Sequence, residues 1–75
     1  MEEEIWKLLQ EINEEIPQNY DISLLDGGYI DSFAIVNIVA ALEDKYSIEF
    51  KAEDIIPENF SQISSMATLV GKYKV

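Results

Sequence analysis

The chain has no cysteine, no histidine and no arginine among its 75 residues. Without cysteine there are no disulfide bonds, no thiolate catalysis by the polypeptide and no cysteine-based zinc sites. Without histidine the commonest general base and the commonest metal ligand are also missing. Because the chain is shorter than the roughly 150 residues of an average domain, we expect a single domain over residues 1–75. We expect no enzyme activity, no catalytic residue and no dedicated metal site.

Positive charge is scarce. Five lysines face 15 aspartates and glutamates, for a net charge of −10. Such a chain is repelled by phosphate backbones and by anionic lipid, which argues against nucleic-acid and membrane binding. No apolar run approaches the roughly 18 residues of a membrane span, and the acidic start Met1–Glu4 does not resemble a signal peptide. These features predict a cytoplasmic monomer whose partners carry basic patches.

Apolar residues that recur every three or four positions predict helices along most of the chain. Pro17 is expected to end the first helix, because the residue before a proline disfavours the helical backbone region. Asp31 and Ser32 are both good first-position caps for the second, most hydrophobic helix. The predicted helical segments are Glu2–Ile16, Asp31 or Ser32 to Tyr46, short turns in Ala52–Ile56 and Pro57–Phe60, and a last helix after Ile63 capped by Ser64 or Ser65.

The segment Gln18–Asp31 is rich in the turn formers Asn, Asp, Ser and Gly, yet apolar residues punctuate it. We therefore expect a long but ordered loop, pinned by its apolar side chains. The fold predicted from these segments is all-α. It is a small four-helix bundle of three main helices and one short helix, with the long loop between the first two helices.

Ser32 is the residue that invites a chemical interpretation. As a nucleophile it would need an activating base, but the chain has no histidine and no lysine close to Ser32 in sequence. As part of a calcium loop starting at Asp21, the pattern fails, because Leu25, Asp26 and Ser32 occupy positions that need a ligand, glycine and glutamate. Two readings remain open: a simple helix cap, or a site of modification at the positive end of a helix.

The segment Gly28-Tyr29-Ile30-Asp31-Ser32-Phe33 resembles the Gly-x-x-Asp-Ser-Leu/Met/Phe signature of acyl carrier proteins and related thiolation domains. The resemblance continues through the second helix and into the segments Ile48–Phe50, Pro57–Phe60 and Ile63–Val70. It implies that Ser32 carries 4′-phosphopantetheine donated by coenzyme A. It also implies that Asp31 helps to present Ser32 to the phosphopantetheinyl transferase.

The function implied by this resemblance is that of a carrier protein. Acyl or aminoacyl groups would be held as thioesters on the phosphopantetheine arm and passed from a loading enzyme to downstream synthases. The chain starts at Met1 without a flanking linker, which favours a free-standing carrier. Fatty-acid, polyketide and specialised pathways are all open, as are the D-alanyl and peptidyl carrier subtypes.

The resemblance also suggests a docking stripe on the second helix, formed by Phe33, Val36 and Ala40 with Glu43 and Asp44 as charged supports. The alternative is core packing for the apolar residues and a solvated face for the acids. Fatty-acid carriers often have acidic residues where this chain has Ala34 and Asn37, so docking to fatty-acid enzymes is less expected.

A different class of function competes with the carrier interpretation: an unmodified acidic adaptor that uses the same bundle only to bind proteins. Ser32 separates the two. A carrier requires its hydroxyl, whereas an adaptor tolerates alanine there, apart from the loss of a helix cap worth about 1 kcal/mol.

Overall fold

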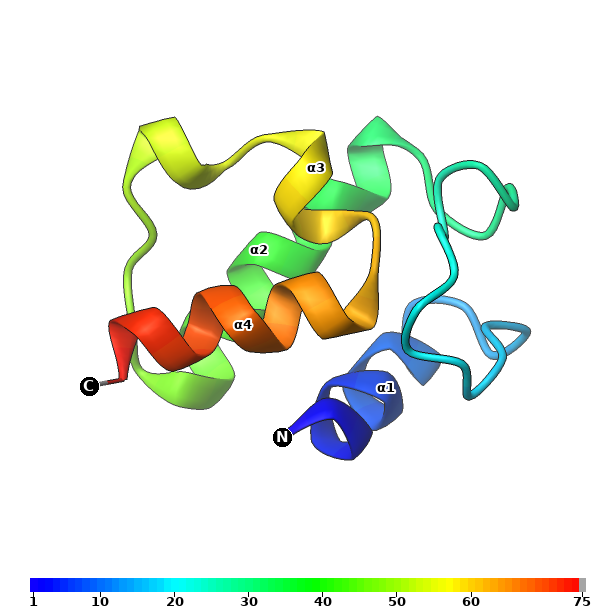
Figure 1. The fold of residues 1–75 in the computed structure, drawn as a ribbon, viewed down its shortest axis with the longest axis horizontal. Coiled ribbons are helices and arrows are strands. Elements are labelled where there is room, and N and C mark those ends of the chain that lie inside the picture. Colours follow the sequence, from blue (N-terminus) through cyan, green and yellow to red (C-terminus); the bar gives the residue numbers. More distant parts are fainter. Residues whose placement is uncertain (75) are drawn as a thin grey trace.

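A computed structural model describes residues 1–74 and shows only helices, turns and loops over that range (Figure 1). The three main helices and one short helix of the sequence-based prediction are confirmed, and the short turn predicted in Ala52–Ile56 is a 3-10 helix. The elements are α1 (Glu2–Gln10), α2 (Ser32–Tyr46), the 3-10 helix η1 (Ala52–Asp54), α3 (Pro57–Phe60) and α4 (Ile63–Tyr73).

One hydrophobic core holds these elements together. Helix α4 packs against α1 and α3, and α2 packs against α1 and α3 from another side. Every α-helix contributes to the core, and so does the long loop. The buried side chains are Ile5, Leu9, Ile16, Leu24, Ile30, Ile35, Ile38, Val39, Leu42, Phe50, Phe60, Ile63, Met66, Leu69 and Val70.

The first helix is shorter than the sequence predicts, ending at Gln10 and not at Ile16. Beyond Gln10 the chain turns. The Asn13 side chain accepts a hydrogen bond from the Glu15 N–H and donates one to the Tyr29 carbonyl. Side chains from α1 also reach over, as Trp6 Nε1 and Gln10 Nε2 both donate to the Ile16 carbonyl. These local side-chain bonds compete with the helix, which is why the apolar periodicity overestimates its length.

The boundaries of α2 follow from its caps, whereas α4 starts without a side-chain cap. The Asp31 carboxylate accepts the Ala34 N–H at 2.9 Å, so Asp31 is the cap and Ser32 is the first helical residue. At the other end Ser47 adopts the left-handed conformation (φ 55°) and its N–H bonds the Glu43 carbonyl. Helix α4 starts at Ile63, before the predicted caps Ser64 and Ser65, and Gln62 takes the cap position without a side-chain bond.

The long loop between α1 and α2 is fastened to the rest of the molecule, as the sequence predicts. The Leu24 N–H donates to the Ser61 carbonyl at 2.7 Å, and the Ser64 N–H donates to the Tyr20 carbonyl at 2.9 Å. Gln62 Nε2 donates to the Asp21 carbonyl. The loop is thereby tied to the junction between α3 and α4, and it delivers the chain to the start of α2.

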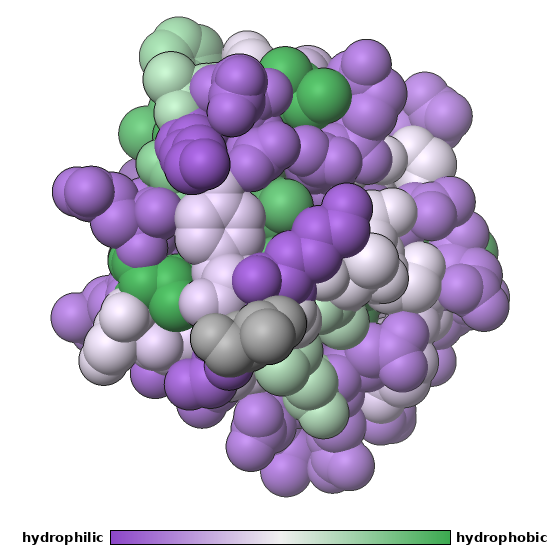
Figure 2. Space-filling view, turned by 60° about the vertical axis from the view of Figure 1, so that its left-hand side comes forward, coloured by the Kyte–Doolittle hydropathy of each residue, from purple (hydrophilic) through white to green (hydrophobic). Residues whose placement is uncertain are grey.

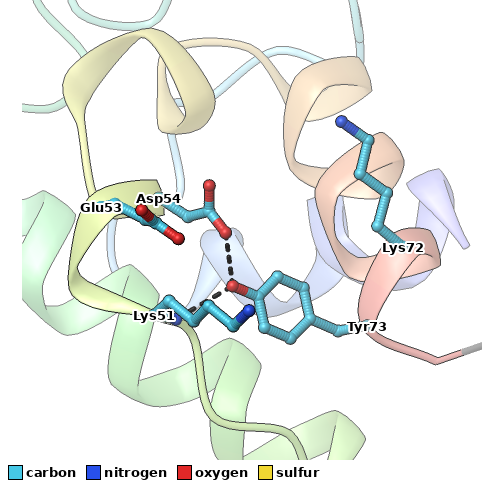
Figure 3. A pocket seen from close by; sticks show the side chains of 5 residues that line it. All are labelled: Lys51, Glu53, Asp54, Lys72 and Tyr73. Carbon is cyan, nitrogen blue, oxygen red and sulfur yellow. Dashed lines mark hydrogen bonds between the residues drawn. The ribbon is translucent and has the colours of Figure 1, made fainter.

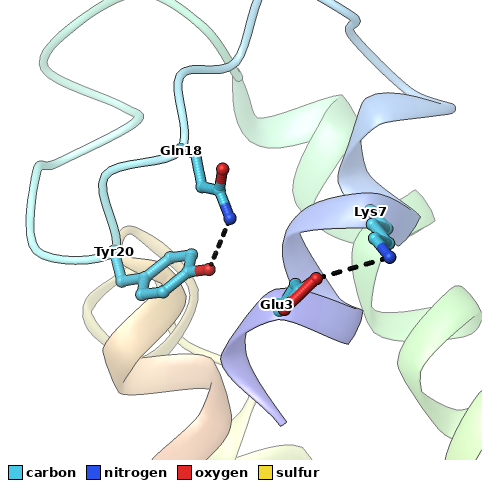
Figure 4. Close-up of polar contacts among 4 residues, drawn as sticks. All are labelled: Glu3, Lys7, Gln18 and Tyr20. Carbon is cyan, nitrogen blue, oxygen red and sulfur yellow. Dashed lines mark hydrogen bonds and ion pairs between the residues drawn. The ribbon is translucent and has the colours of Figure 1, made fainter.

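Hydrophilic residues cover most of the face in Figure 2, with smaller apolar areas between them. Within residues 1–74 one ion pair forms, between Lys7 Nζ and Glu3 Oε2 at 3.4 Å, one turn apart on α1 (Figure 4). Nearby, Gln18 Nε2 donates to the Tyr20 hydroxyl (Figure 4). Most acidic side chains of the described chain therefore keep an unneutralised charge at the surface.

None of the helices in the described part of the chain is both long enough and apolar enough to pass through a membrane.

Candidate functional site

Ser32 lies exposed at the start of α2. Its hydroxyl makes no hydrogen bond to residues 1–74, because the capping role belongs to Asp31. A serine that neither caps its helix nor contributes to the core is available to a partner. The sequence leaves two interpretations of Ser32 open, and the structure excludes the one in which Ser32 is the helix cap.

The backbone around Ser32 suits a phosphate ester. The first N–H groups of a helix lack intrahelical partners and point out of its positive end. In α2 the Ala34 N–H is bound by the Asp31 carboxylate and the Ile35 N–H by the Asp31 carbonyl. The N–H groups of Ser32 and Phe33 have no partner within residues 1–74. Two donors therefore remain beside the hydroxyl, which fits a phosphodiester attached there.

The approach to Ser32 depends on a tight turn in the loop. Gly28 has a φ of +78°, a left-handed conformation that glycine adopts without a Cβ penalty. The turn is closed by hydrogen bonds from the N–H groups of Tyr29 and Ile30 to the Leu24 carbonyl. Ile30 is then buried, whereas Asp31 is exposed. The buried isoleucine anchors the chain directly before the exposed Asp31–Ser32 pair.

Phe33, Val36 and Ala40 share an exposed stripe of α2. The side chain of Phe33 is 82% exposed and that of Val36 is 66% exposed, values far from those of core residues. Ala40 is exposed as well. Core packing is thus excluded for these three residues. An exposed phenylalanine and valine next to Ser32 form an apolar surface whose contact with water is energetically unfavourable.

The two acidic residues of the predicted docking stripe lie in different environments. Asp44 is exposed on α2. Glu43 is half-buried, and its Oε2 accepts the Phe50 N–H at 2.9 Å. The Glu43 carboxylate therefore fastens the connection after α2, which is a structural role that the sequence does not reveal.

Ile55 and Ile56 are exposed apolar residues that the sequence interpretation does not single out. They are 40% and 39% exposed, in the link between η1 and α3, and α3 packs against α2. In the sequence the two isoleucines lie directly before Pro57, in a segment predicted to form short helical turns. Such a short segment has no apolar periodicity from which an exposed face can be predicted. The adjacent pair of apolar residues is the one feature of the sequence that could have drawn attention to them.

A surface depression of about 390 Å³ lies elsewhere, lined by Lys51, Glu53, Asp54, Lys72 and Tyr73 (Figure 3). The Tyr73 hydroxyl donates to the Asp54 carboxylate and accepts the Lys51 N–H (Figure 3). The hydrogen bond to Asp54 raises the pKa of Tyr73. These bonds join the end of α4 to η1, so we assign this depression a structural role. Within residues 1–74 no group of three acidic side chains is placed to hold a metal ion.

A family model matches most of the chain. The model described as "Phosphopantetheine attachment site" matches residues 3–70. The chain belongs to this family. Proteins of the family are carriers with a covalently attached 4′-phosphopantetheine, so the cofactor expected from the sequence is confirmed.

Individual proteins also match the chain. D-alanyl carrier proteins of Bacillus mycoides and Bacillus cereus are each 30% identical to the chain over 54 residues. The matched segment covers 69% of this chain and 68% of each relative. A D-alanyl carrier protein of Bacillus anthracis matches to the same extent. No solved structure matches the chain at a significant level.

Proposed function

We propose that Ser32 carries the phosphopantetheine arm and that the thiol of the arm holds an aminoacyl group, D-alanyl in the first instance. The observation that carries the attachment site is the exposed Ser32 hydroxyl, beside two unpartnered N–H groups at the start of α2. Asp31 supports this site by capping the helix with its carboxylate. The D-alanyl cargo rests on the similarity to the Bacillus carriers.

Catalysis belongs to the partner enzymes in this proposal. A phosphopantetheinyl transferase attaches the arm, an enzyme that activates D-alanine with ATP loads it, and an acceptor enzyme removes the aminoacyl group. The polypeptide itself has no thiol, so the arm supplies the only one. The carrier acts as a cytoplasmic monomer that meets these enzymes in turn.

The docking face consists of Phe33, Val36 and Ala40, with Asp44 at its charged edge. The Phe33 and Val36 side chains are exposed next to the attachment site, where a partner enzyme must reach the arm. A net charge of −10 steers the carrier towards basic surfaces and speeds association without demanding tight binding. The partner therefore presents an apolar pocket with lysine or arginine at its rim. Glu43 contributes indirectly, by holding the chain after α2.

The attachment site is tested by intact mass after incubation with coenzyme A and a broad-specificity phosphopantetheinyl transferase. We expect one phosphopantetheinyl group per chain and one titratable thiol. Ser32→Ala should gain neither, and Ser64→Ala, which removes a hydroxyl from α4, should be modified like the wild type. A wild-type mass that stays unchanged on folded protein would favour the unmodified adaptor.

The cargo is tested on the modified protein. With the D-alanine-activating enzyme of a Bacillus carrier system, ATP and D-alanine, we expect a mass increase of one alanyl group that hydroxylamine removes. L-alanine and a fatty acyl donor with its own ligase are the comparison substrates. Loading by the fatty acyl system alone would replace the D-alanyl assignment with an acyl carrier assignment.

A further inference from the structure

A groove of about 380 Å³ lies directly beside the attachment site. It is lined by Ile12, Asn13, Asp31, Ala34 and the loop residues 28–30. Asp31 directly precedes Ser32 and Ala34 follows it by two residues, so the groove starts beside the point where an arm on Ser32 would start. From there it extends to the end of the turn that follows α1.

We propose that this groove, called the arm groove below, is the resting site of the chain's own phosphopantetheine arm. The inference rests on the proposed attachment at Ser32. It adds a location for the arm between visits to partner enzymes. The occupant follows from continuity, because a group bonded to Ser32 starts beside a groove that is lined by Asp31, the residue before that serine, and by Ala34, two residues after it.

The chemistry of the walls matches that of the arm. Along its length, pantetheine carries a dimethyl group, a hydroxyl and two amides. Ile12, Ile30 and Ala34 offer apolar wall to the dimethyl group. Asn13 uses one Nδ2–H on the Tyr29 carbonyl, and an amide nitrogen has two such donors, so one remains for an arm carbonyl. Because the arm is tethered, weak contacts of this kind suffice to hold it.

A second depression is less suitable for the arm. It has a volume of about 230 Å³, lies between the loop and α3, and is lined in part by the carboxylates Asp26 and Glu58. None of its lining residues adjoins Ser32, and two carboxylates disfavour a phosphate. The single carboxylate of the arm groove, on Asp31, is already bound to the Ala34 N–H.

The arm groove and the docking face occupy different flanks of α2. Successive helical residues turn by about 100°, so Ala34 and Val36 point about 160° apart. Val36 and the nearby Phe33 stay exposed whether or not the arm lies in its groove. A partner can therefore dock on the Val36 flank while the arm rests on the Ala34 flank, and draw the arm out afterwards.

Amide chemical shifts of ¹⁵N-labelled protein before and after modification test the proposal, with intact mass confirming that the arm is attached. We expect shifts at Ile12 and Asn13, which are remote from Ser32 in sequence, larger than those at Ile55 and Ile56. Nuclear Overhauser contacts should join the dimethyl protons of the arm to the Ile12 methyl groups. Shifts confined to residues near Ser32, or extending instead to Ile55 and Ile56, would overturn the arm groove and leave the carrier function standing.

Ala34→Met fills the groove from within, and Ala41→Met makes the same change two turns along the same flank, outside the groove. Both variants should still gain the arm by mass. The arm-dependent shift at Ile12 should be lost in Ala34→Met and kept in Ala41→Met. Equal shifts in the two variants would contradict the proposal. Failure of the wild type to gain mass would instead overturn the attachment site and the groove together.

Discussion

The two ends of α2 are built for different tasks. At its C-terminal end, Glu43 binds the Phe50 N–H, and the Tyr46 hydroxyl donates to Glu4 on α1 at 3.1 Å. At its N-terminal end the helix relies on the single cap from Asp31, and Phe33 and Val36 face solvent. Side-chain bonds between distant segments therefore gather at one end, and unused apolar surface gathers at the other. Stability and recognition are separated along one helix.

The largest expected difference in stability is between variants of two phenylalanines, one in the core and one on the docking face. Phe60 is fully buried and packs edge to face on Phe50, with ring centroids 5.5 Å apart. Phe60→Ala should lower the free energy of unfolding by about 3–5 kcal/mol, which is a large fraction of the stability of a small domain. Phe33→Ala should change it by less than about 0.5 kcal/mol, since the side chain is 82% exposed.

Urea unfolding measures both variants, and the rate of phosphopantetheine transfer measures what Phe33 does. We expect transfer to Phe33→Ala to slow while the fold stays intact. If Phe33→Ala is as unstable as Phe60→Ala, or is modified at the wild-type rate, the separation of recognition from stability is wrong.

A smaller effect distinguishes the two neighbours at the N-terminal end. Asp31→Ala removes the cap and should lower the free energy of unfolding by about 1 kcal/mol. Ser32→Ala should cost at most a few tenths of a kcal/mol, because the serine is not the cap and alanine favours a helix. This replaces the cap loss that the sequence alone suggests for Ser32.

Asp31→Asn sharpens this comparison, because asparagine caps about as well as aspartate but carries no charge. We expect it to keep the stability of the wild type in urea unfolding. A slower transfer of phosphopantetheine to this variant would assign the Asp31 charge a part in presenting Ser32. A variant as unstable as Asp31→Ala would show that the charge, not the cap geometry, supports the helix.

The last effect concerns the C-terminal end of α2 and is confined to high pH. Burial, with the hydrogen bond to Glu4 and its negative charge, raises the pKa of Tyr46 from 10.0 to about 12. Between these values the unfolded chain releases this proton while the folded chain retains it, so stability falls as pH rises from about 10 to about 12. Below pH 10 this contribution is fully present.

Tyr46→Phe should flatten part of this decline, as seen in urea midpoints measured at several pH values from 9 to about 12. Tyr20→Phe removes a hydroxyl outside the contact with Glu4 and is the matched control. A decline with the same slope in wild type and Tyr46→Phe would show that the Tyr46–Glu4 bond does not couple α1 to the end of α2.

Much of the site could be predicted from the sequence, because it is local. The Asp-Ser pair before an apolar run marks a helix start. The start of α2 at Ser32 and its end at Tyr46 agree with the prediction. Exposure of Phe33 and Val36 was less predictable, since an apolar residue on the most hydrophobic helix has two candidate faces.

What only the tertiary structure decided depends on contacts between distant segments. Helix α1 ends at Gln10 because Trp6, Gln10 and Asn13 bond the loop, and a periodic pattern does not record such bonds. Glu43 reads as a surface acid until the Phe50 N–H is found against it. Composition and periodicity determined the helical class and the start of α2, since each needs only near neighbours. The arm groove needs the turn after α1, the end of the long loop and α2 together, so packing alone created it.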